Sequence, residues 1–225
     1  MKRSTSRGVV GAVLCLTTVL ASCAEEPRGE LHESDVDSIM VSINGERYQQ
    51  LAVGEVVTGA FVRSGRQAFL DIEHNSAQKP RIDRVTNGQA DVVVGCTGEL
   101  LFYMDPERAK ELSEKYQEDK RKGLDPNDGT WRDTVYQEMV GALPSNLMAT
   151  DPSNAQGCPN YDGPELPQNV VPVFREVALN RQDRVILNKI TGGITTDDLK
   201  TLVEGDQSRD ATRVRADELL TKLTF

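Results

Sequence analysis

The chain alternates short apolar runs with longer stretches in which apolar residues recur every three or four positions. Three short runs rich in β-branched residues predict buried strands. These runs cover residues 38–43, 68–73 and 91–95. Between them, apolar residues at helical spacing predict helices over 47–63 and 81–87. Gly65 and Gly88 follow these two stretches, which is where glycine commonly ends a helix.

This order of elements predicts the fold class. Strand, helix, strand, helix and strand within about 60 residues indicate right-handed crossovers and an α/β protein with a parallel sheet. Ligands in such sheets bind beyond the carboxyl ends of the strands. Those ends are Asn44-Gly45, His74-Asn75-Ser76 and Cys96-Thr97-Gly98-Glu99. A binding site is therefore expected where these three segments meet.

The second half of the chain predicts helices, one strand and a long connection. A highly charged helix over 105–122, begun by Pro106, and a helix over 130–143 flank a turn-rich stretch. Residues 144–168 hold five prolines and predict an irregular connection. A strand over 170–174 contains proline and is expected near an edge or bulge. The last helices are predicted near 180–190, 196–203 and 211–223.

The first residues have the pattern of an export signal. Lys2, Arg3 and Arg7 precede an apolar run over 9–20, which is shorter than the roughly 20 residues that span a bilayer. Leu20-Ala21-Ser22-Cys23 resembles the bacterial lipobox. The resemblance implies that residues 1–22 are a signal peptide, that Cys23 carries lipid such as palmitate, and that residues 23–37 form a tether. An ordinary secretory signal with an incidental cysteine, or an uncleaved anchor, is the alternative.

Charge and motif content exclude several classes of function. The chain has a formal net charge of −9, which becomes −12 when the three basic residues of the signal leave, so a nucleic-acid partner is not expected. His32 and His74 lack neighbours at metal-ligand spacing, and residues 125–129 lack the distal glutamate of a calcium loop. No nucleotide-binding or nucleophile motif occurs, so we expect no enzyme, no cofactor and no metal.

Three ordered stretches resemble the substrate-binding lipoproteins of ABC importers for glycine betaine, choline and related osmoprotectants. They are Ile39 to Glu55 with its Gln49-Gln50-Leu51-Ala52-Val53-Gly54-Glu55, Val85 to Gly98, and Asn169 to Leu199 with its Ile194-Thr195-Thr196-Asp197-Asp198-Leu199. Their order along the chain matches the family's order, and together they cover roughly half of the mature chain. No single motif decides the resemblance.

The resemblance implies a type II periplasmic-binding-protein fold, in which two α/β lobes close over a ligand by hinge motion. Lobe one would take residues 38–103 and the return segment 167–225, leaving residues 104–166 for a reduced, loop-rich second lobe. The function implied is a solute-binding lipoprotein on the extracytoplasmic face of the cell membrane, delivering a small molecule to an ABC permease. The alternative is a scaffold that has lost the solute and acts through protein–protein contact. The short middle segment favours this alternative.

The family holds quaternary ammonium ligands in an aromatic cage, by cation–π attraction. The aromatic residues nearest the inferred cleft are Tyr103, Trp131, Tyr136 and Tyr161, with Glu99 as a counter-charge. We favour packing roles for these rings, because aromatic residues are large hydrophobes before they are ligand contacts. The family commonly has tyrosine where Cys96 stands. Further candidates at strand ends are Asn44, Thr97 and Gly98, the last two as backbone donors to a ligand carboxylate or as an ordinary turn.

Two cysteines remain for pairing. Cys15 leaves with the signal and Cys23 is acylated, which leaves Cys96 and Cys158 in a compartment where disulfides persist. The resemblance brings both near the cleft, so we predict a disulfide between them. Two free thiols, or a bridge between two molecules, are the alternatives.

Overall fold

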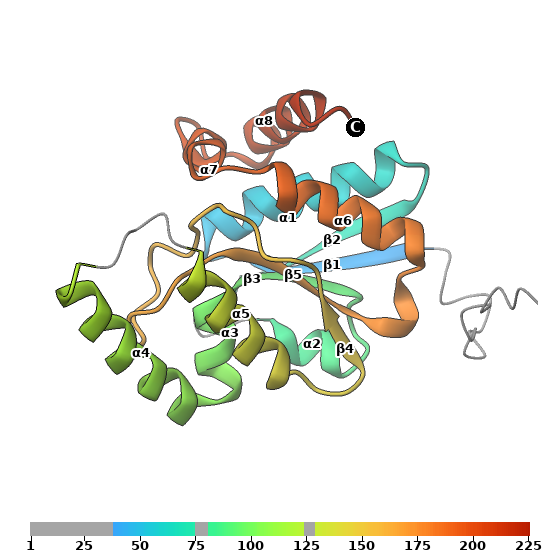
Figure 1. The fold of residues 1–225 in the computed structure, drawn as a ribbon. Coiled ribbons are helices and arrows are strands. Elements are labelled where there is room, and N and C mark those ends of the chain that lie inside the picture. Colours follow the sequence, from blue (N-terminus) through green and yellow to red (C-terminus); the bar gives the residue numbers. More distant parts are fainter. Residues whose placement is uncertain (1–37, 75–80, 124–128) are drawn as a thin grey trace, which may run out of the picture.

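The computed structural model describes residues 38–74, 81–123 and 129–225, which are built around one five-stranded sheet (Figure 1). The strand order is β2-β1-β3-β5-β4. The strands are β1 (Ser38–Asn44), β2 (Gln67–Glu73), β3 (Val92–Cys96), β4 (Leu147–Ala149) and β5 (Val170–Arg175). As the sequence predicts, β1 is parallel to both β2 and β3. β5 runs antiparallel to β3 and to β4.

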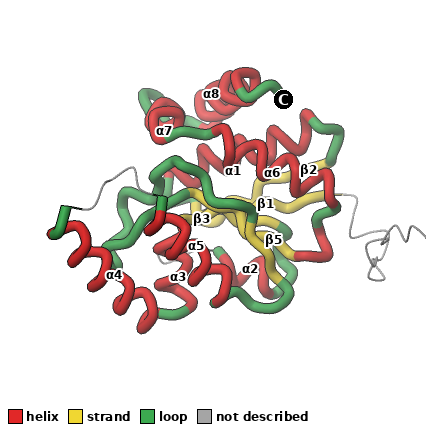
Figure 2. Tube along the Cα trace, viewed as in Figure 1, coloured by secondary structure: helices red, strands yellow, loops and turns green. Residues whose placement is uncertain are grey.

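Helices cover both faces of the sheet, as Figures 1 and 2 show. One face carries α1 (Tyr48–Arg63), α6 (Arg181–Gly193), α7 (Thr196–Val203) and α8 (Arg209–Lys222). The other carries α2 (Ile82–Thr86), α3 (Thr97–Met104), α4 (Pro106–Arg121) and α5 (Thr130–Gly141). A short 3-10 helix, η2 (Glu176–Ala178), follows β5. The protein is thus a three-layer α/β structure.

The central position of β3 in the sheet explains why its first three residues are all valines. Val92 and Val94 pack into the core beneath α1 and α6, and Val93 packs into the opposite core with α3 and α5. Successive side chains of a strand point to opposite faces, so a strand covered on both faces needs an apolar residue at every position. All three valines are at most 3% exposed.

Two elements of the structure are not predicted by the sequence pattern. Helix α3 begins at Thr97, where a strand end and turn are expected, and β4 lies within the connection predicted to be irregular. α3 has no side-chain cap, and β4 is three residues long and pairs with β5. Because both are stabilised by partners distant in sequence, local periodicity does not detect them.

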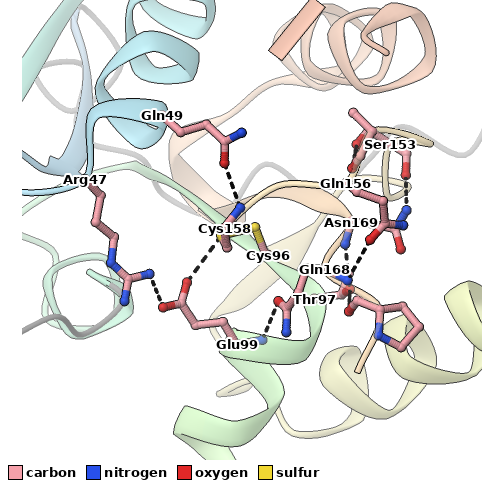
Figure 3. The surroundings of a disulfide bond; sticks show 12 residues. Arg47, Gln49, Cys96, Thr97, Glu99, Ser153, Gln156, Cys158, Gln168 and Asn169 are labelled. Atoms are coloured by element: carbon pink, nitrogen blue, oxygen red, sulfur yellow. Dashed lines mark hydrogen bonds and ion pairs between the residues drawn. A yellow bond between two sulfur atoms is a disulfide. The ribbon is translucent and has the colours of Figure 1, made fainter. Parts of the chain in front are cut away.

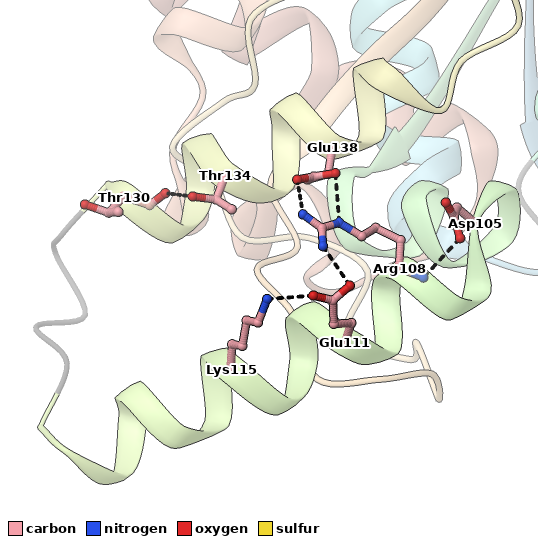
Figure 4. Close-up of polar contacts among 7 residues, drawn as sticks. All are labelled: Asp105, Arg108, Glu111, Lys115, Thr130, Thr134 and Glu138. Carbon is pink, nitrogen blue, oxygen red and sulfur yellow. Dashed lines mark hydrogen bonds and ion pairs between the residues drawn. The ribbon is translucent and has the colours of Figure 1, made fainter.

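Helix α4 is charged along most of its length and is stabilised by ion pairs at its surface (Figure 4). Asp105 caps it by accepting a hydrogen bond of 3.0 Å from the Arg108 N–H. The Arg108 guanidinium bridges Glu111 on α4, at 2.7 Å, and Glu138 on α5. The Glu111 carboxylate also accepts a 2.6 Å bond from Lys115. Such pairs support a helix whose few buried residues supply little packing energy.

Residues 104–166, predicted as a reduced second lobe, supply α4, α5 and β4. β4 belongs to the same sheet as β1–β3, and Leu112, Val135 and Met139 share a core with Val93. The lobe boundaries remain a prediction. Cys23, the signal peptide and the tether lie outside the described residues. Among the described residues, no helix has the length and apolar character needed to cross a membrane.

Candidate functional site

A disulfide lies where the carboxyl end of β3 meets the first turn of α1 and the segment 157–169 (Figure 3). It joins Cys96, the last residue of β3, to Cys158, and the two Cα atoms are 6.2 Å apart. Both residues are buried. The predicted pairing is therefore present in the structure, and it fastens the long connection over the end of the sheet.

Beside the disulfide, Glu99 and Arg47 form a buried ion pair. Glu99 lies in the first turn of α3 and Arg47 directly precedes α1, so the pair joins the helices that follow β3 and β1. Glu99 is 3% exposed. Burial raises the pKa of the Glu99 carboxyl above its usual range, and the positive charge of Arg47 offsets part of that increase. The structure thus places the predicted counter-charge at the strand ends with a cation already beside it.

The backbone donors at the start of α3 are used within the chain. Thr97 N–H donates to the Asn169 carbonyl at 3.0 Å, and Gly98 N–H donates to the Pro167 carbonyl at 3.2 Å. Glu99 N–H donates to the side-chain carbonyl of Gln168 at 3.0 Å. A β-carbon on Gly98 would lie 2.9 Å from the Pro167 oxygen, which explains why glycine is needed there. The segment 167–169 thus occupies the donors proposed for a ligand carboxylate.

Several polar side-chain atoms in this region are buried without a hydrogen-bond partner among the described residues. They include Asn44 Nδ2, Gln168 Nε2 and the Tyr161 hydroxyl. Burial, together with the negative charges of Glu99 and Asp162, raises the pKa of Tyr161. An unsatisfied buried polar group costs about 1–3 kcal/mol. Polar groups held in this state are candidates for ligand binding.

A pocket of about 190 Å³ opens beside the disulfide, between the start of α1, the Cys158 segment and the end of α7. Arg47, Gln49, Gln50, Cys158 and Asn160 are among its lining residues. Gln50 is 6% exposed, and neither polar atom of its side chain has a partner among the described residues. The pocket is smaller than the roughly 300 Å³ of sites for drug-sized ligands, so it suits a small solute.

Of the four aromatic candidates, Trp131 and Tyr136 pack against the core that holds Val93, and Tyr161 packs against the opposite core. The Trp131 ring meets Tyr116 edge-on at 5.3 Å between centroids, and its indole N–H donates to Asp119. Tyr161 meets Phe102 edge-on at 6.2 Å, and Tyr103 is exposed. Burial and the charge of Asp151 raise the pKa of Tyr136. Among the described residues, no ring-to-ring contact joins two of the four candidates.

Sequence reasoning did not assign roles to Arg47, Gln49, Gln50 and Gln168. The first three lie just after the carboxyl end of β1, and a cluster of polar residues at that place is a detectable signal. Gln168 had no such signal, because its contact with Glu99 spans 69 positions.

Comparisons with known proteins agree with this architecture. No family model and no curated protein matches the chain. A solved structure of apo YehZ from Escherichia coli matches with a TM-score of 0.57 at 10% identity, covering 83% of this chain and 99% of that one. A glycine betaine/carnitine/choline ABC transporter structure matches with a TM-score of 0.50 at 14% identity, covering 82% and 98%. The chain shares the fold of these two structures. Such low identities establish the fold and leave the ligand open.

Proposed function

We propose that this chain is an exported lipoprotein that binds a small polar solute and serves, or descends from, an ABC importer of the osmoprotectant type. The observation that carries the proposal is the buried polar cluster around Glu99, at the carboxyl ends of β1 and β3. Ligand sites in α/β sheets form beyond the carboxyl ends of the strands. The adjoining pocket gives a solute access to the cluster. The fold shared with solute-binding proteins supports the same reading.

The chemistry of the cluster indicates the solute. Arg47 already neutralises Glu99, so the carboxylate is a weak centre for a free cation. Asn44 Nδ2 and Gln168 Nε2 are donors that lack acceptors among the described residues, and Gln50 offers both a donor and an acceptor. A small solute with oxygen acceptors, such as a carboxylate or a polyol, matches these groups.

We expect no tight binding of a quaternary ammonium ligand, because among the described residues no ring contact brings two of the candidate aromatic residues together in a cage. Calorimetry with glycine betaine, choline, carnitine and proline betaine should therefore give dissociation constants weaker than about 1 μM. A submicromolar constant for any of them would show that Tyr103, Trp131, Tyr136 or Tyr161 forms a cage when ligand is present.

Thermal unfolding with a panel of small carboxylates and polyols tests solute binding directly. A ligand at 100 times its dissociation constant should raise the free energy of unfolding by about 2.7 kcal/mol. Gln50→Leu should abolish the shift, whereas Gln182→Leu, at an exposed position of α6, should keep it. If no solute in the panel stabilises the protein, or if Gln50→Leu retains the shift, the proposed site is wrong.

Anchoring through Cys23 would place the protein on the extracytoplasmic face of the membrane, next to a permease. Cys23→Ser should release the protein from the membrane fraction or leave it unprocessed. Unchanged mass, processing and detergent partitioning would contradict acylation.

One observation favours the second function, a scaffold that acts through protein–protein contact. The three backbone donors at the start of α3 are all bound by residues 167–169, and the disulfide fastens the segment above them. Both features oppose opening of the site. Under this reading no small solute changes the melting temperature, and cross-linking on intact cells recovers a protein partner instead.

A further inference from the structure

The outer edge of β2 lies two strands away from β3, the strand that carries Cys96 of the disulfide. β2 forms one edge of the sheet and is seven residues long, whereas β4 at the other edge has three. An edge strand presents unpaired N–H and C=O groups, and proteins usually protect it by shortness, lysine, proline or a bulge. β2 has no lysine or proline, and its seven residues pair with β1 in unbroken register. Among the described residues, no strand pairs with its outer edge.

A groove of about 360 Å³ runs beside this edge, with walls from β2, α1 and α8. Its lining includes Val62 and Phe69, which are 53% and 54% exposed, together with Leu70 and Leu220. Val62 and Phe69 are therefore large apolar side chains exposed on either side of an open strand, and such residues mark a surface suited to another chain.

Three arginines line the same groove on a chain whose net charge is −9. Arg209 Nε binds the buried Glu55 carboxylate at 2.7 Å, while Arg213 Nε stands 3.8 Å from it. The Arg213 side chain is 65% exposed, so it remains accessible to a negatively charged group. Arg63 binds Asp217 at 2.5 Å. Glu55 and Asp217 also line the groove, so its charged side chains carry a net charge of +1. This positive excess beside apolar side chains is complementary to an acidic segment with apolar anchors.

We propose that β2 and this groove are a docking site for an extended acidic segment of a partner protein, which adds a strand to the free edge of β2. Main-chain hydrogen bonds to β2 would supply affinity, as in β-strand addition to other sheets. Ala68 and Leu70 pack against the core beneath α1, so Phe69 points to the opposite face of the sheet. Side chains of the segment on that face would meet Phe69, and the alternate carboxylates on the α1 face would meet Arg209 and Arg213. The proposal is independent of the solute site, because it uses none of its residues.

Two synthetic peptides as long as β2 test the proposal on the mature chain. One alternates valine with glutamate and the other alternates valine with lysine. The acidic peptide should bind saturably in fluorescence anisotropy and slow hydrogen exchange at residues 67–73, and the basic peptide should not. Arg213→Glu should weaken binding about fivefold, since it replaces an attraction by a repulsion. Arg121→Glu, the same charge change at the end of α4, should leave it unchanged.

A second pair of variants tests the edge itself. Phe69→Lys introduces the kind of residue that protects edge strands and should abolish peptide binding, while Val177→Lys, on a similarly exposed valine of η2, should not. Circular dichroism shows whether each variant is folded. Equal loss in Arg121→Glu, absence of exchange protection in β2, or no acidic binding would overturn the proposal. Edge-to-edge dimers in sedimentation, or binding only after deletion of residues 24–35, would assign the groove to a second copy or to this chain's own N-terminal segment and overturn it as well.

Discussion

The side-chain carbonyl of Gln49 accepts a hydrogen bond of 2.6 Å from the backbone N–H of Cys158. This contact joins the first turn of α1 to the connection that crosses the end of the sheet (Figure 3). Cys158 has a φ of +52°, a conformation that costs a residue with a β-carbon about 1–2 kcal/mol. The hydrogen bond and the disulfide therefore act together to hold a backbone conformation that is unfavourable by itself.

Gln49→Ala should lower the free energy of unfolding by about 1–3 kcal/mol, because it leaves a partly buried N–H without an acceptor. Gln49→Glu should retain most of the stability, since a carboxylate oxygen accepts the same bond. Urea titration gives both values, and Gln182→Ala serves as the matched surface control. A Gln49→Ala protein as stable as the parent would mean that the bond contributes nothing.

Removing the disulfide by Cys96→Ala with Cys158→Ala should lower stability by up to about 4 kcal/mol, from the entropy of the 62-residue separation that the bond closes. Non-reducing peptide mapping should recover the linked peptide pair. Recovery of two alkylatable thiols from the exported protein would contradict the pairing, and an unchanged urea midpoint after reduction would contradict its stabilising role.

The raised pKa of Glu99 predicts how stability depends on pH. Between the ordinary glutamate pKa of 4.5 and the raised folded value, the folded state binds more protons than the unfolded chain. The contribution of this group is therefore fully present below 4.5 and is lost as pH rises through the folded value. Glu99→Gln should remove this loss, so the variant gains stability relative to the parent as pH rises through that window.

Urea midpoints of both proteins across this pH range measure the effect. Glu107→Gln, whose side chain is 86% exposed, is the control and should show no comparable gain. A stability difference between parent and Glu99→Gln that stays constant with pH would show that Arg47 fully offsets burial at this carboxyl. A change in the opposite direction would show that Arg47 dominates over burial.

Val93→Asp should prevent folding, because it places an unpaired charge in the core between β3 and α3, at a cost of several kcal/mol. Val214→Asp, on a valine that is 59% exposed on α8, should be tolerated. Circular dichroism and thermal unfolding distinguish the two variants. A soluble Val93→Asp protein with normal thermal stability would contradict the position of β3 in the sheet.

The sequence by itself determined the parts of the fold that depend on periodicity and local chemistry. The valine run at 92–94 identifies a strand buried on both faces, and apolar residues at helical spacing identify α1. Thr195 and Asp198 form the capping box that starts α7, where sequence placed a helix start. These features depend on residues a few positions apart, so the chain specifies them locally.

Only the tertiary structure decided which polar residues meet. Glu99 was a candidate from its place after β3, but its partners Arg47 and Gln168 lie 52 and 69 positions away. α3 and β4 form through contacts with segment 167–175. Trp131 and Tyr161 pack against different rings, Tyr116 and Phe102. Periodicity records which face of an element is buried, whereas the pairing of distant side chains depends on how the elements pack, and that information is not local in the chain.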